Sequence, residues 1–391
     1  MTGKRTPLKY VKFSLYAVAA TCVMVGSVYL LRQWDPTYLI WKRWKEFDKY
    51  RYEEIHPRFL ETKPIDLIRI KTAKDATRIR HDLIFSIWER EGAPISKQPS
   101  SVDKNFPLAA SGPNSAEWKF YTGIDNLASV DVIHIPVGKK EFGYVSRAFH
   151  FHPKKGDNRL LIYHNGHGGT GTFHDKKERI AELIEAGYAV IALNLPAYGR
   201  NRIGEWRLKR FGRYLLGAWR LLDLVERPMR FWIEPVFVTV NYAHRAYAYA
   251  SIDMIGFSAG GWLTTVAAAV DPRIRRSYPI AGGYPLYLRS GEEHKQSPRP
   301  QYHAPLIRAA NYLEMYVLAA FEGNRRQLQI FNRFDRCCYA NTKGKLYEAA
   351  IKTVLADIKG GNFNVLLDET HPRHTISKFA MKALLRDLAK P

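Results

Sequence analysis

The sequence predicts an α/β protein with a mostly parallel, doubly wound sheet that is opened by an antiparallel hairpin. Short apolar runs suited to buried strands recur from about residue 129 onward and alternate with helical segments. Two earlier β-type runs, at 130–137 and 142–151, flank the turn residues 138–140 (GKK) and indicate the hairpin. One strand leads through residues 256–260 (GFSAG) directly into a helix. Together these observations predict the fold class.

Length and composition agree with a globular enzyme-sized protein. The chain has 391 residues, 46% hydrophobic and 25% charged, which is enough apolar material for a sizeable core and argues against dominant disorder. Lys and Arg total 60 against 37 for Asp and Glu, giving a net charge of +23. This excess favours polyanionic neighbours such as anionic lipid, although a generally basic surface explains it equally well. No nucleic-acid recognition motif accompanies the charge, so no nucleic-acid partner is expected.

The N-terminus predicts a membrane anchor. After a basic tail at 1–12, residues 13–31 (FSLYAVAATCVMVGSVYLL) carry no charge, and as a helix they would rise about 28 Å. Trp34, Trp41 and Trp44 follow, as in an interfacial belt. We expect a single transmembrane helix in a bacterial inner membrane, with the catalytic domain outside the cytoplasm. A cleaved signal peptide and a buried core helix are the alternatives.

Residues 32–128 are expected to form an extension that packs on a catalytic domain at 129–391. Within the extension, 75–91 has helical spacing and 92–114 is rich in loop-forming residues. The later strands are expected at 159–163, 189–194, 252–257, 278–281, 328–332 and 363–367. No internal repeat interrupts this pattern.

Ser258 is the candidate nucleophile. It lies in 256–261 (GFSAGG), between the apolar strand at 251–255 and a helical run that ends at Asp271. A sharp strand-to-helix turn would hold the serine in a strained conformation with its Oγ above the sheet, and the flanking glycines would leave room for that turn. The positive end of the helix favours developing negative charge. A structural glycine-rich turn is the alternative interpretation.

At this motif the chain resembles the α/β-hydrolase superfamily, over about residues 130–391, and is nearest to its esterase and dienelactone-hydrolase-like branch. The resemblance implies an α/β-hydrolase fold, no cofactor, and a triad whose acid and histidine follow the serine. Asp335 then corresponds to the acid, because it follows the strand at 328–332. Asp368 is the alternative acid. A surface salt bridge is the alternative role for Asp335.

The resemblance also implies the position of the base. His374 begins an H-x-I-S ending like that of the family, ahead of the last helix, whereas His371 precedes Pro372 and is the alternative. The remaining family feature is the oxyanion hole, formed by the N–H of Ala259 and a donor from the loop after the third strand. Residues 164–169 (HNGHGG) are similar to the family's H-G-x-G-G loop, which implies His167 as the second donor, with Gly168 next.

The same histidine-rich loop has two other interpretations. His164, His167 and His174 lack a carboxylate or cysteine to complete a zinc site, and a phosphate loop would need a lysine that is missing. No metal or cofactor is therefore expected. Only three cysteines occur, Cys22 and the adjacent Cys337 and Cys338, and neighbouring cysteines rarely bridge, so no disulfide is expected. A small buried residue is the expected role for the adjacent pair, and a redox switch is the alternative.

An insertion at 200–232 separates the fourth strand of the domain from the nucleophile strand. A helix is expected there, with one apolar face and one basic face. The apolar face comprises Leu208, Phe211, Leu215, Trp219 and Leu222, and the basic side comprises Lys209, Arg210, Arg213 and Arg220. A lid over an acyl pocket, a membrane-surface helix and an ordinary packed helix are the alternatives.

The predicted function is a membrane-anchored serine hydrolase that cleaves a small-molecule or lipid-like carboxylic ester through an acyl-enzyme. An acyltransferase would use the same residues. A non-catalytic, membrane-bound binding module with a hydrolase-like fold is the alternative from another class. The sequence leaves the substrate and the oligomeric state open.

Overall fold

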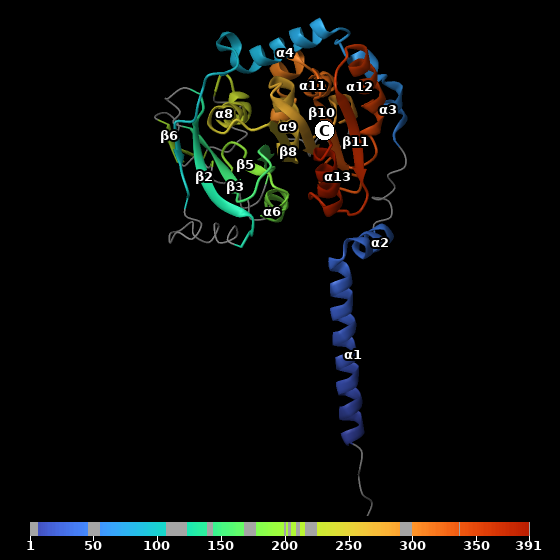
Figure 1. Ribbon diagram of the computed structural model, residues 1–391. Coiled ribbons are helices and arrows are strands. Elements are labelled where there is room, and N and C mark those ends of the chain that lie inside the picture. The colour runs from blue at the N-terminus through green and yellow to red at the C-terminus, as the bar shows by residue number, and fades with distance from the viewer. Residues whose placement is uncertain are drawn as a thin grey trace, which may run out of the picture.

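The computed structural model describes residues 7–45, 55–106, 123–138, 144–167, 177–198, 201, 205–208, 212–215, 225–289, 299–335 and 337–390. Its centre is a nine-stranded sheet in the order β1-β2-β3-β5-β4-β8-β9-β10-β11 (Figure 1). The strands are β1 (Ser101–Asp103), β2 (Leu127–Pro136), β3 (Val145–Pro153), β4 (Arg159–His164), β5 (Ala189–Leu193), β8 (Ser251–Phe257), β9 (Ile274–Ile280), β10 (Arg326–Asn332) and β11 (Asn362–Asp368).

The sheet is mixed, as the sequence predicts. β1, β2 and β3 pair antiparallel, β3 joins β5 antiparallel, and the strands from β5 to β11 in the sheet order are parallel. The predicted hairpin and the six later strands are all present. β1 was not predicted, because it lies in the stretch at 92–114 expected to be loop. Since β8, β9, β10 and β11 are parallel, they all end at one side of the sheet, here named the carboxyl edge.

Helices cover both faces of the sheet. The helices are α1 (Pro7–Gln33), α2 (Asp35–Lys45), α3 (Pro57–Glu61), α4 (Ala73–Trp88), α6 (Lys177–Glu185), α8 (Arg230–Ala246), α9 (Ala259–Val270), α10 (Ala304–Ala309), α11 (Tyr312–Ala320), α12 (Lys345–Asp357) and α13 (Lys378–Leu388). One core lies between the sheet and α8, α9, α11 and α12, and the other lies between the opposite face and α6 and α13. The sheet is therefore doubly wound.

The N-terminal extension packs on the first of these cores through α4. A capping box between Thr72 and Asp75 starts the helix, and its stripe of Ile79, Leu83 and Ile87 is buried. Arg80, also buried, donates to the carbonyl oxygens of α9 and α11, with Nε 3.0 Å from Ala269 O and Nη2 3.1 Å from Leu318 O. These hydrogen bonds to the ends of α9 and α11 thus tie the extension to two helices that pack on the sheet.

The helix predicted in the insertion is wrong where the structure describes it. β6 (Glu205–Leu208) and β7 (Gly212–Leu215) form a separate antiparallel pair. Gly212 has φ +70°, in the left-handed region where a helix cannot pass but a hairpin turn can. Residues 209–211 and 216–224, with Trp219 and Leu222, lie outside the described residues.

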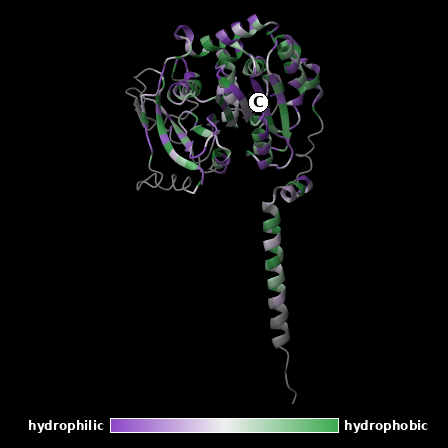
Figure 2. Cartoon of the chain, viewed as in Figure 1, coloured by the Kyte–Doolittle hydropathy of each residue, from purple (hydrophilic) through white to green (hydrophobic). Residues whose placement is uncertain are grey.

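α1 projects from the domain and is largely apolar along its described length (Figures 1 and 2). Among the described helices, none alone is long and apolar enough to cross a membrane, so the single transmembrane helix expected at 13–31 is not supported. Tyr16–Leu31 and Pro36–Lys45 meet at a 97° bend. Only as a pair do these two stretches have the length and apolar composition of a membrane span.

Candidate active site

Ser258 occupies a strained turn between β8 and α9. Its φ of 56° and ψ of −124° lie outside the regions that side-chain-bearing residues favour. The turn is held on both sides: the N–H of Ser258 donates to Ile280 O of the neighbouring strand at 2.8 Å, and Trp262 N donates to Ser258 O at 3.1 Å. Strain that the surroundings hold in place in this way is typical of a nucleophile elbow.

Two glycines of the motif make this turn possible, because neighbouring backbone occupies the space that a side chain at either position would need. A Cβ at Gly256 would lie 2.1 Å from Gly260 O, and one at Gly260 would lie 2.2 Å from His164 O. Neither position has room for any side chain. The spacing of the sequence motif is therefore required by the packing of β8, α9 and the loop after β4.

The loop after β4 lies directly against the serine. A Cβ at Gly166 would lie 2.7 Å from Ser258 Cβ and 2.6 Å from Phe257 O. The side chain of Asn165 fixes this approach, because its Oδ1 accepts the N–H of Gly166 at 3.0 Å. His167 follows, with its ring edge-on to Tyr198 at 5.1 Å between centroids. The predicted oxyanion loop is thus next to the predicted nucleophile, while Gly168 and His174 lie outside the described residues.

Ala259, the other predicted oxyanion donor, is the first residue of α9. The first N–H groups of a helix have no acceptor within the helix and point towards its N-terminal end. The helix dipole adds partial positive charge at the same place. The N-terminus of α9 and the loop at Gly166 and His167 therefore meet beside Ser258, where an anion would be stabilised.

Asp335 and His374 form a close pair at the carboxyl edge. His374 Nδ1 lies 2.6 Å from Asp335 Oδ2, and the Asp335 carboxylate is fully buried while the imidazole is 23% exposed. The other oxygen, Oδ1, accepts the backbone N–H groups of Cys337 at 2.8 Å and Cys338 at 3.3 Å. The His374 ring lies 4.5 Å from that of Phe257, the residue before Ser258. The structure thus brings the three predicted triad residues to one edge.

Asp368 and His371 form a second, separate pair. Asp368 accepts from His371 Nε2 at 3.2 Å, from Thr370 N at 2.9 Å, and from the hydroxyl of Ser377. Burial acts to raise the pKa of Asp368, but these hydrogen bonds outweigh burial and lower the pKa to about 2. This pair anchors both ends of the loop that carries His374 and does not contact Asp335.

Cys337 and Cys338 are joined by a disulfide, contrary to the expectation from sequence. Their two sulfurs and one nitrogen of His374 lie within 4.8 Å of one another. The tight turn after β10, which directs both N–H groups at Asp335, also brings both sulfurs to the same side. The expectation failed because it used a general rule on neighbouring cysteines and not the geometry of this turn.

The sulfurs beside His374 are joined in a disulfide and offer no thiolate, so one other set of side chains among the described residues could hold a metal ion. Asp131, His150 and His152 present ligand atoms within 4.8 Å of one another. Lys104 Nζ already lies 2.9 Å from Asp131 Oδ2 and supplies a cation to that carboxylate. Of the weak zinc set considered from sequence, His164 is buried and its Nδ1 contacts Asn165 O at 2.9 Å. Burial lowers the pKa of His164 to about 4.

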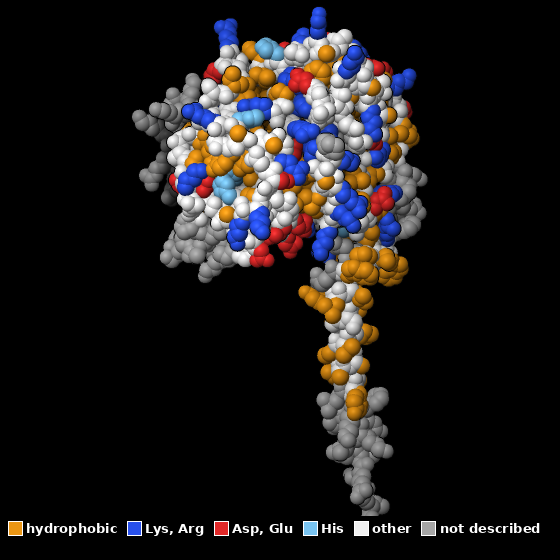
Figure 3. All heavy atoms as spheres, viewed as in Figure 1, with side chains coloured by type: hydrophobic (Ala, Val, Ile, Leu, Met, Phe, Trp, Pro, Cys, Tyr) orange, Lys and Arg blue, Asp and Glu red, His pale blue; other side chains and the backbone are white. Residues whose placement is uncertain are grey.

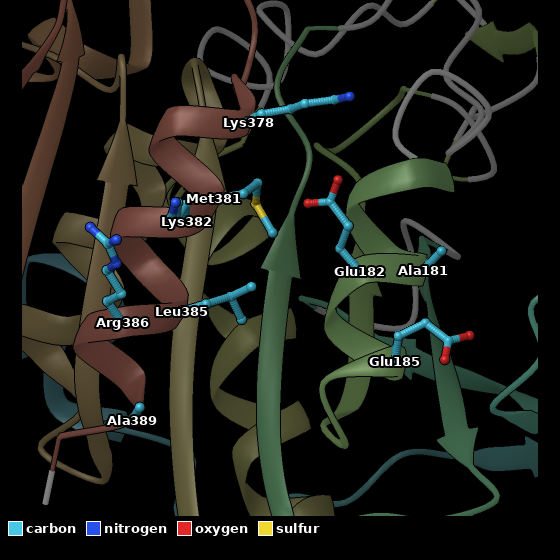
Figure 4. Close-up of a pocket in the computed structure, with 9 residues that line it drawn as sticks. All are labelled: Ala181, Glu182, Glu185, Lys378, Met381, Lys382, Leu385, Arg386 and Ala389. Atoms are coloured by element: carbon cyan, nitrogen blue, oxygen red, sulfur yellow. The ribbon is translucent and has the colours of Figure 1, made fainter.

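A groove on the surface lies between α6 and α13, away from Ser258. Figure 4 shows acidic side chains of α6 on one side and basic side chains of α13 on the other, with Met381 and Leu385 between them. The lining residues are Ala181, Glu182, Glu185, Lys378, Met381, Lys382, Leu385, Arg386 and Ala389. The groove contains none of the predicted site residues, and we assign it no role in the chemistry.

Comparison with solved structures identifies the fold. Methylesterase BT1017 superposes with a TM-score of 0.56 at 16% identity, over 87% of this chain and 69% of that one. Glucuronoyl esterase from Solibacter usitatus gives 0.53 at 12% identity, over 81% and 93%. Acetyl xylan esterase 1 from Thermoanaerobacterium sp. JW/SL YS485 gives 0.50 at 13%, over 87% and 100%. No family model and no curated protein matches the sequence. The chain therefore has the α/β-hydrolase fold, as the resemblance of its sequence motifs to that superfamily implies.

Sequence reasoning did not find three contributors to this site. They are Gly166, which lets the oxyanion loop reach Ser258, and the N–H groups of Cys337 and Cys338 that hold Asp335. Gly166 is the second residue after β4, and a glycine at that position was the available signal for the close approach. Backbone donors leave no signal in side-chain identity.

Proposed function

We propose that this chain is a serine hydrolase of carboxylic esters with Ser258 as nucleophile, His374 as base and Asp335 as the acid that orients the base. The observation that carries the proposal is the strained elbow at Ser258, at the same sheet edge as the 2.6 Å hydrogen bond between His374 and Asp335. The fold shared with three esterases supports it.

In the proposed reaction, His374 Nε2 removes the proton of Ser258 Oγ as the oxygen attacks the ester carbonyl carbon. The N–H groups of Ala259 and His167 stabilise the resulting oxyanion. His374 then gives the proton to the leaving alkoxide, which departs as an alcohol and leaves an acyl-serine. Water, deprotonated by the same imidazole, releases the acid and restores Ser258. The buried Asp335 carboxylate keeps the Nδ1 proton on its own side throughout.

The proposal includes attachment to lipid through α1 and α2. The exposed apolar side chains of α1, the bent pair that α1 forms with α2, and the net charge of +23 support it. The location proposed from sequence is a bacterial inner membrane with the hydrolase domain outside the cytoplasm. Retention of the full chain in the membrane pellet at high salt would support attachment through apolar contact, and release by salt would contradict it.

Turnover of a short-chain chromogenic ester tests the catalytic proposal. Ser258→Ala should lose ester hydrolysis to background while the thermal unfolding transition is kept. Ser251→Ala is the matched control, because Ser251 is also a buried serine of β8 but at the opposite end of the strand. The control should hydrolyse the ester at nearly the wild-type rate. Undiminished activity in Ser258→Ala would overturn the proposal.

A further inference from the structure

Helix α2 packs on the loop that carries Asp335. Leu39 of α2 and Phe334, the residue before Asp335, form a small buried cluster of their own, with Leu39 8% and Phe334 1% exposed. The guanidinium of Arg43, also on α2, lies 4.4 Å from the centre of the Phe334 ring. Leu39 and Arg43 are one helical turn apart, so a single side of α2 covers Phe334.

The same helix also contacts the loop that carries His374. The guanidinium of Arg373, the residue before His374, lies 5.4 Å from the centre of the Tyr38 ring on α2. β8, β10 and β11 run parallel, so Ser258 lies at the edge of the sheet where these two loops begin. α2 therefore lies beside the carboxyl edge, against both loops that position the proposed acid and base.

The other side of α2 is apolar and exposed. Ile40 and Trp44, one helical turn apart, are 67% and 78% exposed, and Trp34 just before α2 is 62% exposed. Figure 3 shows hydrophobic side chains on α2 and along α1, below a domain surface on which Lys and Arg are widespread. Tryptophan is favoured at the boundary of a bilayer, where the ring is in the apolar region and its N–H stays near water.

The bend between α1 and α2 gives these surfaces different orientations. α1 runs away from the domain, whereas the stretch Pro36–Lys45 turns through 97° from Tyr16–Leu31 (Figure 1). A helix that enters lipid and a neighbouring helix that lies along the lipid surface require such an angle. Lys45 is exposed at the end of α2 and would lie at head-group level, where anionic lipid attracts it.

We propose that α2 is an interfacial helix that seats the carboxyl edge of the sheet on an anionic lipid bilayer, so that Ser258 receives its ester from an amphiphile in that bilayer. This inference rests on the proposed function for its chemistry, and it adds the substrate class and the direction of entry. The occupant of the exposed side of α2 is lipid, because α2 continues into an exposed apolar helix and because the protein is strongly basic.

The test uses the full chain in vesicles of phosphatidylcholine and phosphatidylglycerol and two esters of one chromophore. p-Nitrophenyl acetate is dissolved in the buffer, and p-nitrophenyl palmitate is embedded in the vesicles. The double variant Ile40→Ser, Trp44→Ser should lose at least about tenfold on the embedded ester, the effect of about 1.4 kcal/mol, and less than about twofold on the dissolved one. The matched control, Phe85→Ser, Ile95→Ser, removes two exposed apolar side chains of the extension and should change neither rate.

A second measurement is independent of catalysis. Brominated phosphatidylcholine should quench part of the tryptophan emission of the full chain, and Trp44→Phe should reduce the quenched part. Equal loss on both esters, or no loss on either, would overturn the inference, as would a quenched fraction that Trp44→Phe leaves unchanged. If the wild type hydrolyses neither ester while Trp44 is quenched, the proposed function fails and the lipid contact of α2 stands.

Discussion

Replacement of Asp335 by Asn tests the proposed acid without changing its shape. Oδ1 of Asp335 accepts two backbone N–H groups, from Cys337 and Cys338, so the amide oxygen of the variant must stay on that side. The amide NH2 then faces His374 Nδ1, which the carboxylate now approaches to 2.6 Å. Nδ1 must become the acceptor, and the single ring proton moves to Nε2. The imidazole is then in the wrong tautomer to remove a proton from Ser258.

The expected loss in kcat is about 10⁴, or about 5 kcal/mol of transition-state stabilisation, the size found for a triad aspartate in another hydrolase. The assay is kcat on a dissolved chromogenic ester, together with the thermal unfolding midpoint to show that the variant folds. Asp368→Asn is the matched control, because Asp368 is also buried and lies opposite Asn332 in the β10–β11 register. Its kcat should stay within about tenfold of wild type at a temperature where it is folded.

The reasoning is refuted if folded Asp335→Asn retains kcat within tenfold of the wild type. It is also refuted if Asp368→Asn loses as much kcat as Asp335→Asn, because the triad acid would then have been assigned to the wrong strand. A crystal structure would distinguish the two cases by showing which carboxylate faces the His374 ring.

The remaining predictions concern stability and the oxyanion loop. Asp368→Asn should lower the free energy of unfolding at pH 7 by about 2 kcal/mol, because the pKa of Asp368 is held at about 2 instead of 3.8. This stabilisation is complete above about pH 4 and is lost as pH falls through 2, so urea unfolding of the variant should depend less on pH there; an identical pH dependence would contradict the assignment. Gly166→Ala should lower kcat about 10²-fold or more, since its Cβ would displace the loop from Ser258, and unaltered kcat would show that the loop does not contribute. Arg80→Met should cost about 1–3 kcal/mol in urea unfolding by leaving the carbonyl of Ala269 without its side-chain donor, while Leu318 O keeps Arg325; Arg78→Met, at an exposed position, should cost under about 0.5, and equal costs would contradict the role given to α4.

The sequence was sufficient for the features that depend on local pattern. Buried parallel strands are short apolar runs, and the strand–turn–helix context of Ser258 follows from the two glycines whose side chains would overlap neighbouring backbone. The order of acid and histidine after Ser258 came from the family resemblance. The pairing of Asp335 with His374, at 2.6 Å, requires two loops that start on adjacent strands, and chain order alone does not determine it.

The features that the sequence did not predict share a physical cause. Each of them depends on contacts or turn geometry that a periodic pattern does not record. The apolar and basic residues around Gly212 fit a helix by spacing, yet the positive φ of Gly212 breaks a helix and permits a hairpin. The 97° turn between Tyr16–Leu31 and Pro36–Lys45 lies beyond the apolar run at 13–31, and no periodic pattern indicates it. The packing of Leu39 on Phe334 joins segments nearly 300 residues apart, and no local signal predicts it.

Covalent labelling of the serine tests the central claim most directly. The full-length protein is treated with a fluorophosphonate probe at neutral pH, digested, and mapped by mass spectrometry, with heat-unfolded protein as the control for non-specific reaction. We expect one adduct, on Ser258, in the folded protein only, because only the folded elbow combines a base with oxyanion donors. An adduct on another residue, or no adduct in folded protein, would contradict the account of Ser258 as the nucleophile.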